Sequence, residues 1–231
     1  MIWPFTRSHV PALDAASSAR RDALLRQTID LKQPLADMRW VVVDVETGGL
    51  DATRDPLLSI GAVAIEQGRI VFAPSLEVGL RQVQSTAAAN ILIHGISGSE
   101  QRAGEVPHTA LLDWLEFAQG APRVAFHAAF DQTVLRREVR AQLGLPSKAP
   151  WFDAAVVAPL LFPDAAPHCR HLDDWLAHFG IAVYARHGAL ADAYATAELW
   201  LVLLAAAQRD NIGTPHRLQR LLRARRWLSA N

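Results

Sequence analysis

Two acidic residues, Asp44 and Glu46, follow an almost continuous apolar run that begins at Trp40. Residues two apart on a β-strand point to the same face, so both carboxylates converge if the strand continues through them. Two buried carboxylates repel each other, and a hard divalent cation such as Mg²⁺ relieves that repulsion by taking their oxygens as ligands. Alternatively, the strand ends at Val43 and both acids are solvated at its tip. The pair therefore predicts either a cation site or an exposed strand end.

Two further segments carry acids or a histidine where a helix is expected to begin. Asp131 follows a short apolar run and opens a predicted helix, and the helix dipole alone would favour an acid there. His187 lies in a glycine-containing loop five residues before Asp192, near the start of the longest predicted helix. A loop histidine beside a helix-borne carboxylate is typical of a general base beside a metal ligand, and equally of a surface loop followed by a helix-start acid.

The elements that would position these residues alternate between strands and helices. β-Branched and apolar runs predict strands at 40–45, 57–65, 69–72 and 124–126, the second and third joined by a tight turn at Gln67-Gly68. Helical spacing of apolar residues predicts helices at 109–118, 130–143, 172–179 and 192–209, with a helical lead-in at 12–33 that Pro34 ends. Strands followed by alternating helices and short strands indicate a layered α/β domain.

The composition excludes several classes of protein. The 231 residues include 23 Lys+Arg, 23 Asp+Glu and 51% hydrophobic residues, which is too apolar and too weakly charged for a disordered chain. The balanced charge excludes a polycationic coat that binds nucleic acid by bulk charge. The single cysteine, Cys169, excludes an internal disulfide and a multi-cysteine zinc site. A zinc site at His168, Cys169 and His171 is not favoured, because their spacing matches no common zinc motif.

Taken together, the motifs at 43–50, 127–131 and 187–192 resemble the DEDDh group of 3′→5′ exonucleases, the family of bacterial DNA polymerase III epsilon (proofreading) subunits. Further likeness lies at 93–96 and 171–175, and the resemblance covers about residues 38–208. It implies a ribonuclease H-like fold, in which a central mixed β-sheet is flanked by α-helices. Two positions depart from the family pattern: Gly48 stands where many members have Thr, and Ala128 where many have Asn.

The resemblance also implies a mechanism. Two Mg²⁺ or Mn²⁺ ions would be held around the scissile phosphate by Asp44, Glu46, Asp131 and Asp192. His187 would take the proton from the attacking water, and a nucleoside 5′-monophosphate would leave from the 3′ end of the nucleic acid, with DNA favoured over RNA as the substrate. Three residues would contact the substrate, with Leu50 wedged against the terminal base: Thr47, Leu50 and His127.

A non-catalytic nucleic-acid- or polymerase-binding module that kept the fold is the alternative. The expected mark of such a module is the loss of one or more acids, and all four are present. Fold resemblance by itself does not establish activity, so both hypotheses need a test.

We expect three regions: a helical N-terminal extension (1–37), the exonuclease domain (38–209) and a basic C-terminal helix (210–231). The last could pack on the domain, dock in the groove of a partner such as a polymerase, or contact substrate phosphates. The N-terminus lacks the pattern of a signal peptide, and the longest apolar run, Leu199–Ala207, is too short to span a membrane. We therefore expect a soluble, cytoplasmic protein whose partners are nucleic acid 3′ ends.

Overall fold

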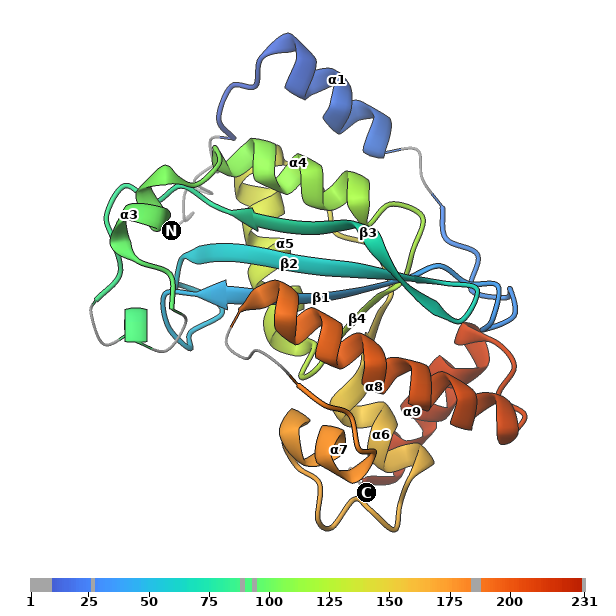
Figure 1. Ribbon diagram of the computed structural model, residues 1–231. Coiled ribbons are helices and arrows are strands. Elements are labelled where there is room, and N and C mark those ends of the chain that lie inside the picture. The colour runs from blue at the N-terminus through green and yellow to red at the C-terminus, as the bar shows by residue number, and fades with distance from the viewer. Residues whose placement is uncertain (1–9, 26–27, 88–89, 93–94, 184–187, 230–231) are drawn as a thin grey trace, which may run out of the picture.

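The computed structural model describes residues 10–25, 28–87, 90–92, 95–183 and 188–229, with side chains described as far as Ala224. Its centre is a five-stranded sheet in the order β3-β2-β1-β4-β5 (Figure 1). β1 pairs antiparallel with β2 and β2 with β3, whereas β4 runs parallel to both β1 and β5, so the sheet is mixed. The strands are β1 (Trp40–Thr47), β2 (Leu57–Glu66), β3 (Arg69–Gly79), β4 (Arg123–Ala125) and β5 (Trp151–Asp153).

Helices cover both faces of this sheet, which confirms the predicted mixed sheet flanked by helices (Figure 1). α4 and α5 pack on one face, with α1 beyond α4, and α6, α7, α8 and α9 lie on the other. The helices are α1 (Ala15–Leu24), α3 (Gly98–Ala103), α4 (Pro107–Phe117), α5 (Ala129–Leu143), α6 (Ala154–Leu161), α7 (Leu172–His178), α8 (Ala189–Arg209) and α9 (Pro215–Ser229).

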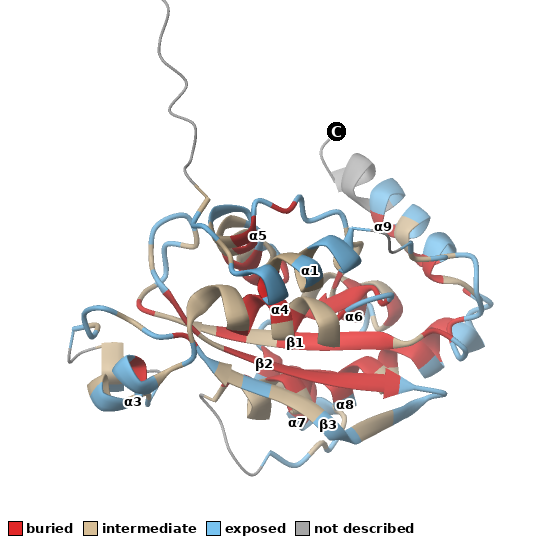
Figure 2. Cartoon of the chain, turned by 90° about the horizontal axis from the view of Figure 1, so that it is seen from above, coloured by how far each residue is buried: buried red, intermediate tan, exposed pale blue. Residues whose placement is uncertain are grey.

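Strand β1 contributes side chains to the hydrophobic clusters on both faces of the sheet. Val41, Val43 and Val45 join the cluster formed with α4 and α5. Trp40 and Val42 join the cluster formed with α6, α7 and α8. Each of these five residues is at most 7% exposed, so β1 is the buried spine of the sheet (Figure 2). Because side chains alternate along a strand, the same pattern decides which helices face the polar residues at the end of β1.

The tight turn predicted between the second and third strands is confirmed. Gln67 and Gly68 both adopt positive φ, 50° and 70°, the backbone of a two-residue hairpin turn. Other boundaries differ from the prediction. The helical lead-in expected at 12–33 is too long, because α1 occupies only Ala15–Leu24 and the backbone at 31–37 forms turns.

Helix α8 has the length and apolar composition of a membrane-crossing helix, although the apolar run Leu199–Ala207 alone was too short for one. More than half of its apolar window, 56%, is buried within the protein, and it packs against β1 and β2. This is the arrangement of a core helix that is covered on its apolar side by a sheet.

Helix α9 packs on the domain by one edge. Leu218 and Leu222, one turn apart, are buried in the cluster with α6 and α8, whereas Arg217, Arg220 and Arg223 are exposed (Figure 2). Of the three arrangements expected for this helix, packing on the domain is therefore present. The exposed arginines of α9 could in addition contact a partner protein or substrate phosphates.

Candidate active site

Asp44 and Glu46 lie within β1, which continues to Thr47. The alternative in which the strand ends at Val43 and the acids are solvated at its tip is therefore wrong. Because side chains alternate along a strand, both acids share the face of Trp40 and Val42, which is the face covered by α8. Their side chains are half-buried.

A glycine on β2 lets the first turn of α8 approach this face closely. Gly61 pairs with Asp44 in the sheet register. A Cβ at Gly61 would lie 2.1 Å from the carbonyl carbon of Ala189 and from the amide nitrogen of Leu190, so only glycine fits there. α8 consequently begins beside the carboxyl end of β1 (Figure 1), and its first turn carries Asp192.

Three of the four predicted metal ligands meet at this point. One carboxylate oxygen from each of Asp44, Glu46 and Asp192 lies within 4.8 Å of the others, and we call these three residues the acid cluster. Within the described part of the chain, no other group of three histidine, cysteine or acidic side chains is close enough to hold one ion. Oxygen donors at this spacing suit a hard divalent cation such as Mg²⁺ or Mn²⁺.

The fourth predicted ligand, Asp131, lies next to the acid cluster but outside it. It stands in the first turn of α5 and is only 4% exposed. Burial raises the pKa of its carboxyl well above the ordinary range, and the negative charges of Asp153 and Glu46 add to the rise. The backbone N–H groups of Asp131 itself and of Val45 offset part of that effect. A buried carboxyl facing two others is a place where added positive charge would be stabilising.

The acid cluster concentrates three carboxyl groups in a half-buried place. Burial, and then the charge of Asp192, raises the pKa of Glu46 from its ordinary 4.5 to about 7. A divalent cation bound between these carboxylates would lower the pKa of Glu46 again, because the cation favours the ionised forms of the carboxyl groups.

This leads to a testable pH dependence of stability in the protein without metal. The folded chain keeps a proton on Glu46 up to pH 7 or so, whereas the unfolded chain releases it near pH 4.5, so stability falls as pH rises through that window. Thermal unfolding in EDTA should show the fall, and Mg²⁺ should raise the midpoint more at about pH 8 than at about pH 5. Glu46→Gln should make the fall in EDTA smaller, leaving the part that the raised pKa of Asp131 contributes; an unchanged curve would contradict the assignment.

Sequence reasoning missed one acid that shapes the site. Asp153, at the end of β5, accepts hydrogen bonds at 3.0 Å from the backbone N–H of His127 and at 3.0 Å from that of Ala155. It thereby ties the loop that leads into α5, where His127 has a positive φ of 60°, to the neighbouring strand. The signal was present as an acid after the short apolar pair Trp151-Phe152, but a strand of three residues is too short to predict from its pattern.

The loop after β1 is held from two sides. Asn90 donates a hydrogen bond to the carbonyl of Gly48, and Arg137 on α5 donates to the carbonyls of Ala52 and Asp55. A Cβ at Gly48 would lie 2.8 Å from a ring carbon of Pro56, which accounts for glycine at this position.

The predicted substrate contacts sit around the acid cluster in different environments. Thr47 is half-buried and its hydroxyl donates to the carbonyl of Gly49 at 2.6 Å. Leu50 is 94% exposed, an unusual state for a large apolar side chain. His127 is exposed and its ring lies edge-on to that of Phe126, 4.7 Å between centroids. Ala128, the second departure from the family pattern, is buried at the start of α5.

Two further sequence interpretations concern the general base and a zinc site. His187, the predicted general base, lies outside the described residues. The segment with His168, Cys169 and His171 does not form a metal-binding group in the described part of the chain, and the Cys169 thiol instead donates to the carbonyl of Asp174 at 3.7 Å.

Comparisons with known proteins agree with this geometry. The family model RNase_T, described as an exonuclease, matches residues 41–200. A DNA polymerase III subunit epsilon-like protein of Rhodobacter capsulatus is 34% identical over 186 residues, covering 78% of this chain and 26% of that protein. A DNA polymerase III subunit epsilon of Rickettsia conorii is 27% identical and covers 75% of this chain and 77% of that protein.

Solved exonuclease structures share the fold. E. coli exonuclease I in complex with a dT13 oligonucleotide matches with a TM-score of 0.63 at 17% identity, covering 75% of this chain and 42% of that one. Exonuclease X in complex with 5′-overhanging duplex DNA matches with a TM-score of 0.58 at 20% identity, covering 73% and 93%. The fold is therefore ribonuclease H-like, as predicted. The chain spans about a quarter of the length of the Rhodobacter relative and 12% of a PolC-type polymerase from Thermotoga petrophila.

Proposed function

Since this chain belongs to the RNase_T exonuclease family, we propose that it is a metal-dependent exonuclease that removes nucleoside 5′-monophosphates from the 3′ end of DNA or RNA. The observation that carries the proposal is the acid cluster, in which three carboxylates from two elements far apart in the sequence approach within 4.8 Å. A binding module without activity would have no reason to hold three mutually repelling acids together at the end of a buried strand.

Four carboxylates would hold two Mg²⁺ or Mn²⁺ ions: Asp44, Glu46, Asp131 and Asp192. The donor set fits such ions, because all four ligands offer oxygen, and because burial and the charge of Asp192 raise the pKa of Glu46, which a bound cation would lower again. When bound, the ions would supply positive charge to the scissile phosphate and make an attacking water more acidic. The protein's part is to fix the carboxylates, through Gly61 under α8 and through Asp153 beside α5.

His187 is proposed as the general base that takes the proton from the attacking water. It immediately precedes Gly188, the residue that caps the start of α8, and Asp192 lies in the first turn of the same helix. The imidazole of a histidine in model peptides has a pKa of about 6.5, so histidine is the side chain suited to accept a proton near neutral pH.

His187→Ala is therefore expected to lower turnover by about 10²- to 10⁴-fold, the usual contribution of a general base. It should also remove the ascending limb of the rate against pH near neutrality. Single-turnover rates across the pH range, with Mg²⁺ saturating, provide the measurement. An ascending limb that survives in the variant would assign the base to another residue.

The substrate's terminal nucleotide would lie against the loop after β1. Leu50, at 94% exposure, is available to pack against the terminal base, and Thr47, next to Glu46, and the exposed His127 would make further contacts. The oligonucleotide bound to E. coli exonuclease I supports a single-stranded substrate here.

Relatives named DNA polymerase III subunit epsilon support a polymerase partner, with residues 1–37 and 210–231 as the regions that would contact it. A cytoplasmic location belongs to the same proposal, since its substrates would be found there.

Direction and substrate are tested with oligonucleotides of one sequence, made as DNA and as RNA and labelled at either end. A 3′-labelled strand should release labelled mononucleotide in the earliest samples, whereas a 5′-labelled strand should shorten stepwise into a ladder. A 3′-terminal phosphorothioate should slow the release. Early mononucleotide from the 5′ label would reverse the direction, and no cleavage of any strand would favour the non-catalytic module.

A further inference from the structure

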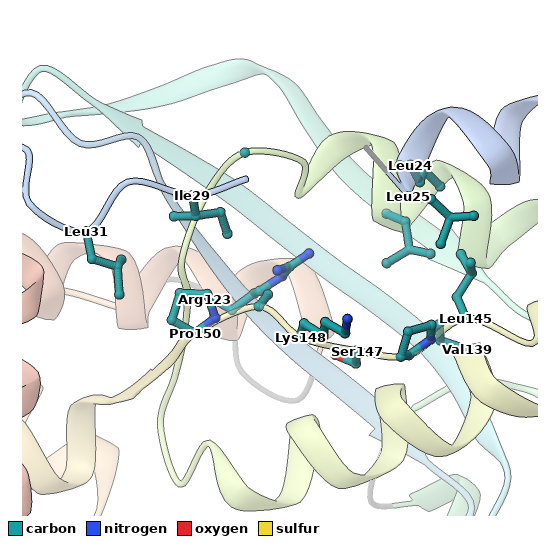
Figure 3. A pocket seen from close by; sticks show the side chains of 14 residues that line it. Leu24, Leu25, Ile29, Leu31, Arg123, Val139, Leu145, Ser147, Lys148 and Pro150 are labelled. Atoms are coloured by element: carbon teal, nitrogen blue, oxygen red, sulfur yellow. The ribbon is translucent and has the colours of Figure 1, made fainter. Parts of the chain in front are cut away.

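A cavity, seen from close by in Figure 3, lies on the α4 and α5 side of the sheet, whereas the acid cluster lies on the α8 side. It has a volume of about 420 Å³ and is lined from α1, α4, α5, the start of β4 and the segment that precedes β5. This volume falls in the range of about 300–1,000 Å³ that is typical of small-molecule sites. Most of its lining is aliphatic, including Leu24, Ile29, Val139 and Leu145.

Arg123, the first residue of β4, extends its side chain into this cavity (Figure 3). The residue is only 8% exposed. Burial lowers the pKa of its guanidinium to about 10, and within the described residues no acid or hydrogen-bond acceptor opposes this effect. The guanidinium carbon lies 5.9 Å from the centre of the Trp114 ring, which covers one side of it.

The charge balance of the cavity is one-sided. Lys148 adds a second cation to the lining, and none of the described lining residues is acidic. Buried charges in proteins are normally paired or hydrogen-bonded, because removing a charge from water without a partner is costly. A guanidinium offers five N–H donors in a planar fork that matches a carboxylate or a phosphate. Among the described residues no acid pairs with Arg123, so an anion suits it as a partner, and the aliphatic lining suits an apolar group attached to that anion.

We propose that this cavity binds a small amphipathic anion, a carboxylate or phosphate on an aliphatic chain, with Arg123 pairing its head group and the aliphatic lining enclosing its tail. The site is separate from the acid cluster. Arg123 pairs with Val41, whose side chain faces α4 and α5, whereas Asp44 and Glu46 face α8 on the other side of β1. Binding here therefore tests neither the exonuclease activity nor its metals.

Isothermal titration of the purified chain with octanoate, octyl phosphate, octanol and octylammonium tests the proposal. The four probes share an alkyl tail and differ in the head group. Comparing their affinities therefore distinguishes the contribution of the head-group charge from that of burying the tail. We expect saturable binding of one anion per chain, with at least one anionic probe bound about 10- to 100-fold more tightly than octanol, as a charge-assisted hydrogen bond would give. Which anion binds more tightly identifies the head group. Equal binding of octanol, or no saturable binding of either anion, would overturn the proposal.

Arg123→Met provides the matched variant, because it keeps an unbranched side chain as long as the stem of arginine through Nε and removes the buried charge. It should fold with an unchanged or higher thermal midpoint, and its preference for the anion over octanol should disappear. Arg209→Met is the control: Arg209 also lies 5.9 Å from an aromatic ring, that of Phe162, but it is exposed and lies outside this cavity. It should keep the preference. A preference that survives in Arg123→Met would overturn the role of Arg123, and the titration of the unaltered chain does not depend on either variant.

Discussion

Asp44→Asn is expected to reduce exonuclease turnover by about a thousandfold or more while leaving the fold intact. The amide keeps the shape of the side chain but removes one of the three negative charges of the acid cluster. Charge stabilisation by bound metal contributes several kcal/mol to such reactions, and each 1.36 kcal/mol is tenfold in rate, so losing a ligand costs about three orders of magnitude. Initial rates on a 5′-labelled oligonucleotide at saturating Mg²⁺ measure the loss.

Asp164→Asn is the matched control, since Asp164 is exposed in the turn after α6 and lies outside the acid cluster. It should retain full turnover. Circular dichroism and the thermal midpoint should be close to those of the unaltered chain for both variants. Unfolding of Asp44→Asn would mean that the acid is structural, and full activity would remove Asp44 from the metal site.

Gly61→Ala is expected to lower exonuclease turnover by about 10²-fold without altering any residue that touches substrate or metal. The added Cβ would lie 2.1 Å from backbone atoms of Ala189 and Leu190, which cannot move aside as a flexible side chain can. The first turn of α8 must shift, and Asp192 moves with it away from Asp44 and Glu46. Displacing a ligand by about 1 Å can cost about 10²-fold in rate, and overpacking adds about 1–3 kcal/mol of destabilisation.

Mg²⁺ titrations of activity should show a raised half-saturating concentration in Gly61→Ala. Gly79→Ala is the matched control, because Gly79 ends the neighbouring strand β3 and its added Cβ would meet only the carbonyl of Leu58, at 3.8 Å. That variant should behave as the unaltered chain. Normal Mg²⁺ dependence in Gly61→Ala would mean that the close approach of α8 does not position Asp192.

The strand that carries the site could be predicted from sequence because its signal is local. The apolar run from Trp40 predicts a buried strand, and the period of two then places Asp44 and Glu46 on one face, as the structure confirms. The first turn of α5, which carries Asp131, and the end of that helix at Gly144, which has φ of 67°, could likewise be predicted from an acid after a strand and a glycine after a helix.

What the sequence does not contain is the distance between elements. Gly61 read only as a glycine within a strand, since its role depends on which helix packs over it. Asp153 depends on β5 pairing with β4, a contact between short strands far apart in the chain. The buried position of Arg123 likewise emerges only when α1, α4 and α5 pack around it. Such non-local contacts carry no periodic signal.

The most direct test of the account is a cleavage gel in which metal and acid are varied together. A 5′-labelled single-stranded oligonucleotide, as DNA and as RNA, is incubated with the unaltered chain or with Asp44→Asn, in EDTA, Mg²⁺ or Mn²⁺. The account predicts a ladder that shortens from the 3′ end only when the unaltered chain and a divalent metal are both present. A ladder of equal strength in EDTA or with Asp44→Asn, or no ladder with either metal, would contradict it.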